Sequence, residues 1–316
     1  MKALESRARM NRKLEEALGA NLCRQLADPD VIEIMLNPDG TLFVERLAGG
    51  MEIVGSLDPA RAEVVIGIVA HALDQEVNDI MPIVSGEIPL GRHRFEGLLP
   101  PAVGAPTFSI RRRAISQIPL EDYVRQETMS PGQFDRLLCA IKARQNILVC
   151  GGTGSGKTTL ANAVLQEIHK CFPNDRIVLI EDTLEIDCPA KNAVTLRSSD
   201  SLAIDRLLKS TLRLRPDRIM VGEVRDGAAL TLLKAWNTGH PGGFTTLHAN
   251  NALGALRRLE QLVCEVSQMP MQHVIADAID LIVSIKRSEG KRRIDEVVSV
   301  EGFDAGRYLL VDQQRS

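Results

Sequence analysis

The chain has 316 residues, of which 44% are apolar and 25% charged, and its formal net charge is −3. This composition is typical of a globular protein with a substantial core, and the length favours two domains. The small net charge gives no general attraction to nucleic acid or to a membrane surface. The aromatic content of 3% argues against a platform that stacks single-stranded bases.

The six cysteines form no C-x-x-C pair. They predict buried thiols in a reducing compartment rather than a disulfide framework or a zinc site. The segment from Met1 to Leu18 is charged and lacks the apolar core of a signal peptide. The longest apolar stretch, around Val64 to Leu73, is too short to span a bilayer. We therefore expect a cytoplasmic protein.

The first 115 residues predict a smaller α+β domain. Leucines at helical spacing among charges predict a long amphipathic helix over residues 4–26. The turn Asn37-Pro38-Asp39-Gly40 separates two strands, and Pro59 begins a second helix that continues to about residue 75. The strands are predicted at 31–36, 41–46, 51–54, 87–90, 92–98 and 107–111. This arrangement favours antiparallel pairing.

Residues 132–316 predict an α/β domain. The polar segment 116–131 has prolines at 119 and 131 and is interpreted as the linker, and a helix over 131–144 follows it. Apolar runs of strand length then alternate with helical stretches, which favours a mainly parallel sheet covered on both faces. These runs lie at 146–150, 176–180, 193–196, 219–221, 244–247 and 281–285, before a hairpin over 293–300 and 307–311.

A glycine-rich loop between the first of these strands and a helix has the sequence GGTGSGKT over 151–158 and fits G-x-x-x-x-G-K-[ST]. Backbone N–H groups in such a loop bind phosphate oxygens, and the helix N-terminus adds positive potential. Lys157 would contact the β- and γ-phosphates, and the Thr158 hydroxyl would bind Mg²⁺. The predicted ATP-binding residues are Gly152, Thr153, Gly154, Ser155, Gly156, Lys157, Thr158 and Thr159.

Polar residues follow three of the predicted strands, at the sheet edge where open α/β sheets bind ligands. Glu181 and Asp182 follow one strand, and either would assist Thr158 in holding the metal through water. Glu223 follows another and is predicted to orient the attacking water as a base. His248 follows the third and is a candidate sensor of the γ-phosphate, whereas His240 would position its own loop.

Arginines are of interest because phosphoryl transfer needs a cation for the charge of the transition state. One cluster, at positions 92 and 94, and another, at 111–113, lie in the first domain. The triplet 111–113 alternatively favours contact with nucleic acid or anionic lipid. Four more arginines, at 213, 215, 218 and 225, flank the strand that precedes Glu223.

The order of four segments resembles the secretion-superfamily, or traffic, ATPases, which drive type IV secretion and conjugation, type II secretion and type IV pili. After the phosphate loop these segments are IEDTLE at 180–185, RPDRIMVGEVRD at 215–226 and TGHPGGFTTLHAN at 238–250. The four-cysteine metal module of type II and pilus-assembly members does not occur in this sequence, nor does the Ala-Ile-Arg-Asn motif of retraction motors. The chain is most similar to the conjugal-transfer ATPases of type IV secretion. Thr183 stands where pilus members often have proline, which affects the fine geometry of the acidic segment.

The resemblance implies a RecA-like C-terminal ATPase domain, a PAS-like N-terminal domain and a homohexameric ring with ATP between the two domains. Arg94 and Arg111 fit the family's γ-phosphate arginines best, with Arg92 and Arg112 next. The resemblance also implies inner-membrane secretion components as partners and peripheral membrane association through them. Three alternatives remain: a type II or pilus motor, a RecA-like nucleic-acid translocase, and a scaffold gated by nucleotide. Direct nucleic-acid binding stays open.

Overall fold

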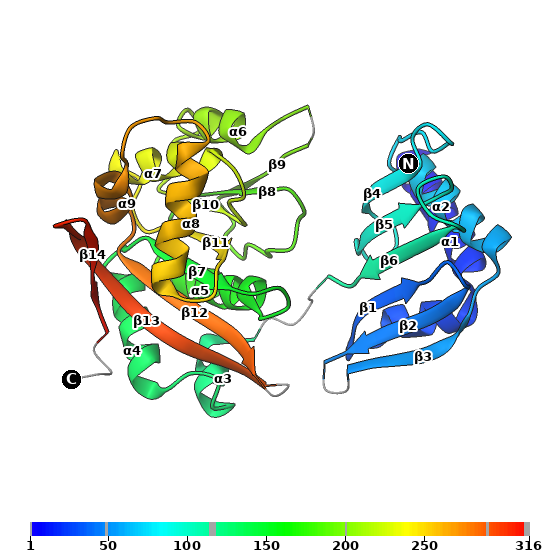
Figure 1. Ribbon diagram of the computed structural model, residues 1–316, viewed down its shortest axis with the longest axis horizontal. Helices are drawn as coiled ribbons and strands as arrows, with labels where there is room; N and C mark the ends of the chain where they lie inside the picture. The colour runs from blue at the N-terminus through cyan, green and yellow to red at the C-terminus, as the bar shows by residue number, and fades with distance from the viewer. Residues whose placement is uncertain (1, 48–49, 114–117, 200, 289–290, 313–316) are drawn as a thin grey trace. The chain divides into compact units, whose positions relative to one another are not determined.

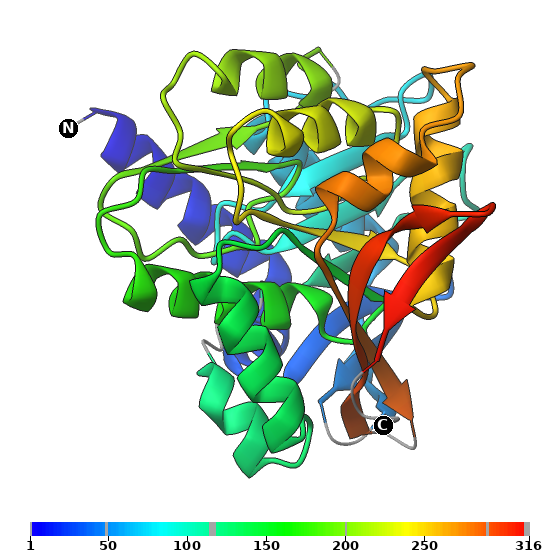
Figure 2. The same ribbon diagram turned by 90° about the vertical axis from the view of Figure 1, so that its left-hand side faces the viewer.

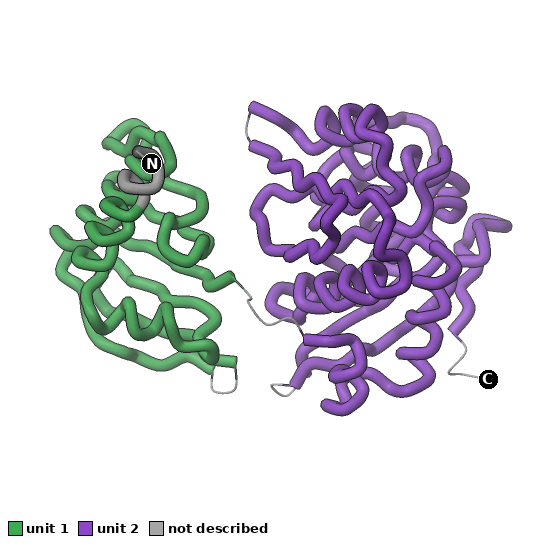
Figure 3. The backbone as a smooth tube through the Cα atoms, turned by 180° about the vertical axis from the view of Figure 1, so that it is seen from behind, with its two compact units in different colours: residues 1–115 green, residues 116–316 purple. Residues whose placement is uncertain are grey.

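The computed structural model describes residues 2–47, 50–113, 118–199, 201–288 and 291–312, with side chains from residue 8 onward. The chain divides into two compact units, residues 1–115 and 116–316 (Figure 3). Unit 1 has one hydrophobic core, and unit 2 has a core on each side of its sheet. The segment 114–117, which contains the predicted start of the linker, lies outside the described residues.

Unit 1 is a six-stranded antiparallel sheet in the order β3-β2-β1-β6-β5-β4. Its two helices pack on one face, where leucines of α1 meet α2 and the inner side chains of the strands (Figure 1). The elements are α1 (Lys2–Ala27), β1 (Val31–Leu36), β2 (Thr41–Arg46), β3 (Gly50–Ser56), α2 (Pro59–Ala72), β4 (Ile83–Glu87), β5 (Arg94–Leu98) and β6 (Thr107–Arg111).

Two predicted strands of unit 1 were misplaced. The strand expected at 87–90 is β4 at Ile83–Glu87, and the one expected at 92–98 begins at Arg94. The cause is a tight turn between them, because Gly91 and Arg92 have φ values of 71° and 55°, in the left-handed region. Backbone in that region cannot continue a strand.

Unit 2 is built on an eight-stranded sheet in the order β14-β13-β12-β7-β11-β10-β8-β9. Strands β12 to β9 of this order run parallel, whereas β13 and β14 add an antiparallel edge. The strands are β7 (Ile147–Gly151), β8 (Ile177–Glu181), β9 (Ala193–Arg197), β10 (Arg218–Val221), β11 (Phe244–His248), β12 (Leu281–Ser288), β13 (Lys291–Asp304) and β14 (Arg307–Val311).

Helices cover both faces of this sheet (Figure 2). Alternate residues of β7 show the two layers, because Ile147 and Val149 join one core and Leu148 and Cys150 join the other. One layer contains α3 (Leu120–Arg125), α4 (Pro131–Lys142) and α5 (Lys157–Cys171). The opposite layer contains α6 (Ile204–Thr211), α7 (Ala228–Asn237), α8 (Ala252–Cys264) and α9 (Gln272–Ala278).

The segment interpreted as a linker is largely part of unit 2. Residues 120–125 form helix α3, and the side chains of Leu120, Tyr123 and Met129 are buried in the core beneath α4 and α5. The polar residues of this stretch lie on the outer side of a short helix. For that reason its average composition suggested a free connection.

The prediction of six buried thiols was also wrong. Cys150 lies in the central strand β7 and is buried, which raises the pKa of its thiol to about 12. Cys139 and Cys264 are exposed, the first on the outer side of α4 and the second at the end of α8. The other three cysteines are half-buried.

A buried ion pair anchors the amino end of strand β10. The guanidinium of Arg218 is fully buried, donates to Asp175 Oδ2 at 2.7 Å and to the Gly242 carbonyl at 2.6 Å, and stacks on Phe172. Arg144 donates to the other oxygen of Asp175 at 2.7 Å. Burial alone would raise the pKa of Asp175, but the hydrogen bonds from the two arginines outweigh it and lower that pKa.

We expect Asp175→Ala to destabilise the protein by about 3–5 kcal/mol, because it leaves the Arg218 charge buried without a partner. The measurement is the urea midpoint at pH 7. Because the folded-state pKa of Asp175 lies below the ordinary 3.8, the wild-type advantage should persist above that pH and shrink below it. The control is Asp122→Ala, which removes an exposed pair with Arg125 and should cost less than about 1 kcal/mol. Equal midpoints for the two variants would contradict the assignment.

Candidate active site

The phosphate loop lies between β7 and α5 and is open on one side. Gly154 and Gly156 have φ values of 69° and 102°, which only glycine adopts without strain. Gly151 is closely packed, since a Cβ there would lie 2.3 Å from the Ile285 carbonyl oxygen. At Gly152 and Gly154 a Cβ would meet no heavy atom within 4 Å. The backbone of the loop is therefore accessible to a ligand.

Two polar side chains inside the loop fit a phosphate group. The ammonium of Lys157 donates to the carbonyl oxygens of Gly151 and Gly152 at 3.0 Å each and lies 3.3 Å from His248 Nδ1. The hydroxyl of Ser155 is buried and has no hydrogen-bond partner within the described parts of the chain. Because buried polar groups normally have a partner, this hydroxyl and the ammonium suit an anionic ligand.

The predicted strand-end residues converge beside this loop. Strands β7, β11, β10 and β8 are neighbours, so the phosphate loop, His248, Glu223 and Glu181 lie along one edge of the sheet. His248 links two of them, because its Nε2 is 3.0 Å from Glu223 Oε1 while its Nδ1 faces Lys157.

Arg225, four residues after the end of β10, binds the other oxygen of Glu223. Its Nη2 and Nε donate to Glu223 Oε2 at 2.6 and 3.0 Å, and its Nη1 donates to Asp182 Oδ2 at 2.8 Å. Burial opposes the charge of Arg225, yet the hydrogen bond to Glu223 and the carboxylate charges raise its pKa. Arg225 thus binds one oxygen of Glu223, and the His248 ring lies beside the other.

The carboxylate beside Thr158 belongs to Glu185, which the sequence analysis did not single out. The Thr158 hydroxyl donates to Glu185 Oε2 at 3.1 Å. Glu181 is buried, and its Oε1 accepts the backbone N–H groups of Glu185 and Ile186 at 3.1 and 3.0 Å. Glu181 therefore holds the loop that carries Glu185, while Asp182 is bound by Arg225.

A divalent cation fits this pair of oxygen donors. Mg²⁺ prefers oxygen ligands, and the Thr158 hydroxyl and the Glu185 carboxylate would supply them. The described residues contain no group of three or more His, Cys, Asp or Glu side chains that could hold a metal on its own. Phosphate oxygens and water would have to complete the coordination, as is usual for Mg²⁺.

Asn162 on the second turn of α5 attaches the acidic loop to the phosphate-binding helix. Its Nδ2 donates to the carbonyl oxygens of Thr158 and Glu185 at 3.1 and 3.4 Å, and its Oδ1 accepts from the backbone of Asp187 at 2.8 Å. Asn162 fits no short motif, and Glu185 lies at the end of the segment IEDTLE without being the residue directly after the strand. Only the fold places them at the site.

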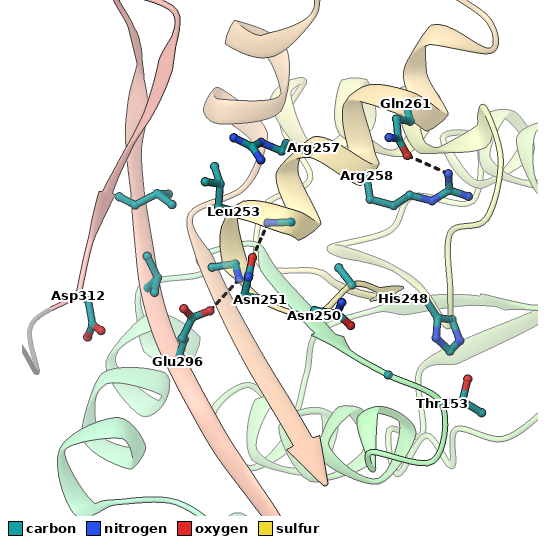
Figure 4. A pocket seen from close by; sticks show the side chains of 16 residues that line it. Thr153, His248, Asn250, Asn251, Leu253, Arg257, Arg258, Gln261, Glu296 and Asp312 are labelled. Atoms are coloured by element: carbon teal, nitrogen blue, oxygen red, sulfur yellow. Dashed lines mark hydrogen bonds between the residues drawn. The ribbon is translucent and has the colours of Figure 1, made fainter. Parts of the chain in front are cut away.

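A pocket of about 820 Å³ extends from the phosphate loop along the first turns of α8 (Figure 4). Its walls include Thr153 and His248 on the loop side and Glu296 of β13 on the far side. Arg257 and Arg258 project from α8 in this region, and Arg258 donates to Gln261 at 3.1 Å. No sequence pattern predicts a role for these arginines, because α8 has an ordinary amphipathic pattern.

In unit 1, Arg94 and Arg111 lie directly opposite each other on β5 and β6. Each also lies opposite a glutamate on its other side, Glu87 on β4 for Arg94 and Glu33 on β1 for Arg111, so the two like charges are offset within the sheet. Arg112 instead donates to the backbone carbonyls of Asp28 and Val31. Arg92 donates to Glu87.

Two further candidates lie away from the phosphate loop. His240 contacts the Pro216 carbonyl oxygen at 3.1 Å and precedes β11, whereas His248 ends it. Arg218 is the first residue of β10 and belongs to the buried pair with Asp175. Both are therefore at the opposite end of the parallel strands from Glu223.

Relatives of this chain are known. A family model described as "Type II/IV secretion system protein" matches residues 92–296. The conjugal transfer protein TrbB of Rhizobium radiobacter is 60% identical, over 98% of this chain and 95% of that protein. The type IV secretion system protein VirB11 of Bartonella quintana is 32% identical, over 86% of this chain and 89% of its own length.

A solved structure shares the fold. The pilus retraction motor PilT, described with bound ADP, has a TM-score of 0.65 and 21% identity, and covers 95% of this chain and 82% of its own. At that identity the likeness concerns the fold alone. Together with the matching family model, the near full-length identity to TrbB confirms the resemblance inferred from the ordered motifs, and the chain belongs to the type II/IV secretion system protein family.

Proposed function

We propose that this protein hydrolyses ATP to power a type IV secretion apparatus that transfers DNA in conjugation. The observation that carries the proposal is the convergence of the phosphate loop, Glu223 and His248 at one edge of the sheet. Its relatives are named for conjugal transfer and type IV secretion, which supports this branch over a type II or pilus motor.

Binding of the nucleotide begins with the phosphate loop. Its backbone N–H groups and the Lys157 ammonium would bind the phosphates, so that Lys157 exchanges its carbonyl contacts for phosphate oxygens. When bound by Thr158 and Glu185, Mg²⁺ would neutralise phosphate charge as it develops. Glu181 keeps Glu185 at that position through the loop backbone.

Hydrolysis requires a group that orients water, and Glu223 is the carboxylate placed for it. Arg225 binds its Oε2 and His248 lies beside its Oε1. Since each carboxylate oxygen has two lone pairs, the carboxylate can accept a water proton while both contacts remain. His248 contacts both Lys157 and Glu223. A change at Lys157 on phosphate binding would therefore reach Glu223 through one imidazole ring.

We further propose a homohexameric ring of subunits in which unit 2 is RecA-like and unit 1 is PAS-like. The order of parallel strands around β7 supports the first description. The placement of two arginines side by side, Arg94 and Arg111, supports a role for unit 1 in binding the γ-phosphate. None of the described helices is at once long and apolar enough to cross a bilayer. We propose peripheral association through inner-membrane secretion components.

Lys157→Ala should weaken ATP binding by about 10- to 100-fold, because charge-assisted hydrogen bonds contribute about 1.5–3 kcal/mol. Binding of a fluorescent ATP analogue measures this change. The control is Lys170→Ala at the other end of α5, where the lysine pairs with Glu167 and Glu121. Unchanged affinity in Lys157→Ala would remove the phosphate loop from the proposal.

Glu223→Gln should lower ATP turnover by about 10²- to 10⁴-fold, because the amide cannot accept the proton of the attacking water. ATP binding should persist, so steady-state kinetics and equilibrium binding are measured on the same preparation. The exposed Glu265, at the end of α8, provides the control variant Glu265→Gln. Full turnover in Glu223→Gln would exclude this carboxylate as the base.

The ring proposal predicts that ATP turnover per subunit rises with protein concentration together with a six-subunit mass. Turnover assays and light scattering across the same dilution series test this dependence. Arg94→Ala should lower turnover without changing the mass, since the arginine would act on the γ-phosphate. A monomer that hydrolyses ATP at the full rate would overturn the ring, and a translocase acting on DNA would be tested next.

A further inference from the structure

Helix α2 is apolar on two sides, but the sheet covers only one of them. Ala62, Val65, Ile66 and Val69 face the core of unit 1 and are buried. On another side Val64 is 54% exposed, and Ile68 one turn later is half-buried, because it packs partly against the core of unit 1. Soluble helices usually place charged or polar residues on the side away from the core, so an apolar outer side indicates a surface that is covered in the working assembly.

The exposed side of α2 and the facing side of α1 form a groove of about 440 Å³. The two helices lie side by side on unit 1 (Figure 1). Gly67 leaves the groove open, because a Cβ there would meet no heavy atom within 4 Å. The groove is lined by Arg9, Met10, Lys13, Val64, Gly67, Ile68 and His71.

The rim of the groove is basic. Arg9 and Lys13 on α1 are exposed, and among the described side chains neither has an ion-pair partner. His71 lies on the α2 side, and none of the described residues that line the groove carries a carboxylate. An apolar groove between two helices, with cations on its rim, is complementary to an amphipathic helix whose polar side is acidic.

We propose that this groove docks an acidic amphipathic helix of a partner protein. Apolar side chains of that helix would pack on Val64 and Ile68 and approach the backbone closely at Gly67. Its carboxylates would pair with Arg9 and Lys13. A helix fits better than a bilayer, because a flat surface cannot fill a concave groove. The proposal relies on the proposed function only in that the partner would be a secretion component.

The test uses the full-length protein and a labelled helical peptide with leucines on one face and glutamates on the other. We expect saturable binding by fluorescence anisotropy, weakened about tenfold or more by Gly67→Glu and also by Gly67→Gln, which blocks the groove without charge. Lys13→Ala should weaken binding and reduce its dependence on salt. A peptide of the same composition in scrambled order should not bind, nor should one with lysines in place of the glutamates.

The matched control is Gly132→Glu, since Gly132 also lies in a helix and also has open space around its Cβ position. All glycine variants should retain the wild-type melting temperature and ATP turnover, so a loss of binding is not a loss of folding. The proposal is overturned if Gly67→Glu binds the peptide as wild type does, or if the scrambled peptide binds equally. It is also overturned if only phosphatidylglycerol vesicles bind, because the surface would then face a membrane.

The two proposals fail separately in this design. Peptide binding by a wild-type protein without ATP turnover would overturn the ATPase proposal and leave the docking groove standing. ATP turnover without any peptide binding would overturn the docking groove and leave the ATPase proposal standing.

Discussion

The candidate site is organised around the contacts of one carboxylate, Glu223. One of its oxygens faces His248, which in turn faces Lys157 of the phosphate loop. The other is bound by Arg225, which also binds Asp182 of the neighbouring strand. This chain of contacts connects the ends of four central strands, β7, β11, β10 and β8, at the edge where the ligand would bind.

The acidic loop after β8 lies at the same edge of the sheet. Glu181 is buried and uses its carboxylate to bind two backbone N–H groups, which leaves Glu185 to contact Thr158. A carboxylate buried in this way shapes a loop, whereas one at the loop tip can contact a metal or phosphate. Glu181 therefore shapes the loop, whereas Glu185 contacts Thr158. These separate roles explain why the acidic segment contains more carboxylates than a metal site requires.

Unit 1 has two surface features that suit the binding of other molecules. Arg94 and Arg111 oppose each other across a strand pair, which fits a site for an anion. The outer side of α2 exposes Val64 beside the basic groove with α1, which fits a docked helix. These features lie on different elements of the unit, so nucleotide contact and partner docking would not compete for the same residues.

Much of this protein was determined by its sequence alone. The phosphate loop, the parallel strands and the ordered motifs follow from local patterns, because a tight glycine turn, an apolar run or a strand end is specified by adjacent residues. Only the tertiary structure placed Glu185 at Thr158, Arg225 at Glu223 and Arg218 in a buried pair away from the site. It also placed Leu120, Tyr123 and Met129, which belong to the segment interpreted as the linker, in a core of unit 2. Such contacts join residues far apart in the chain. The local sequence around a charged side chain does not specify its partner, because tertiary packing determines which residues become its neighbours.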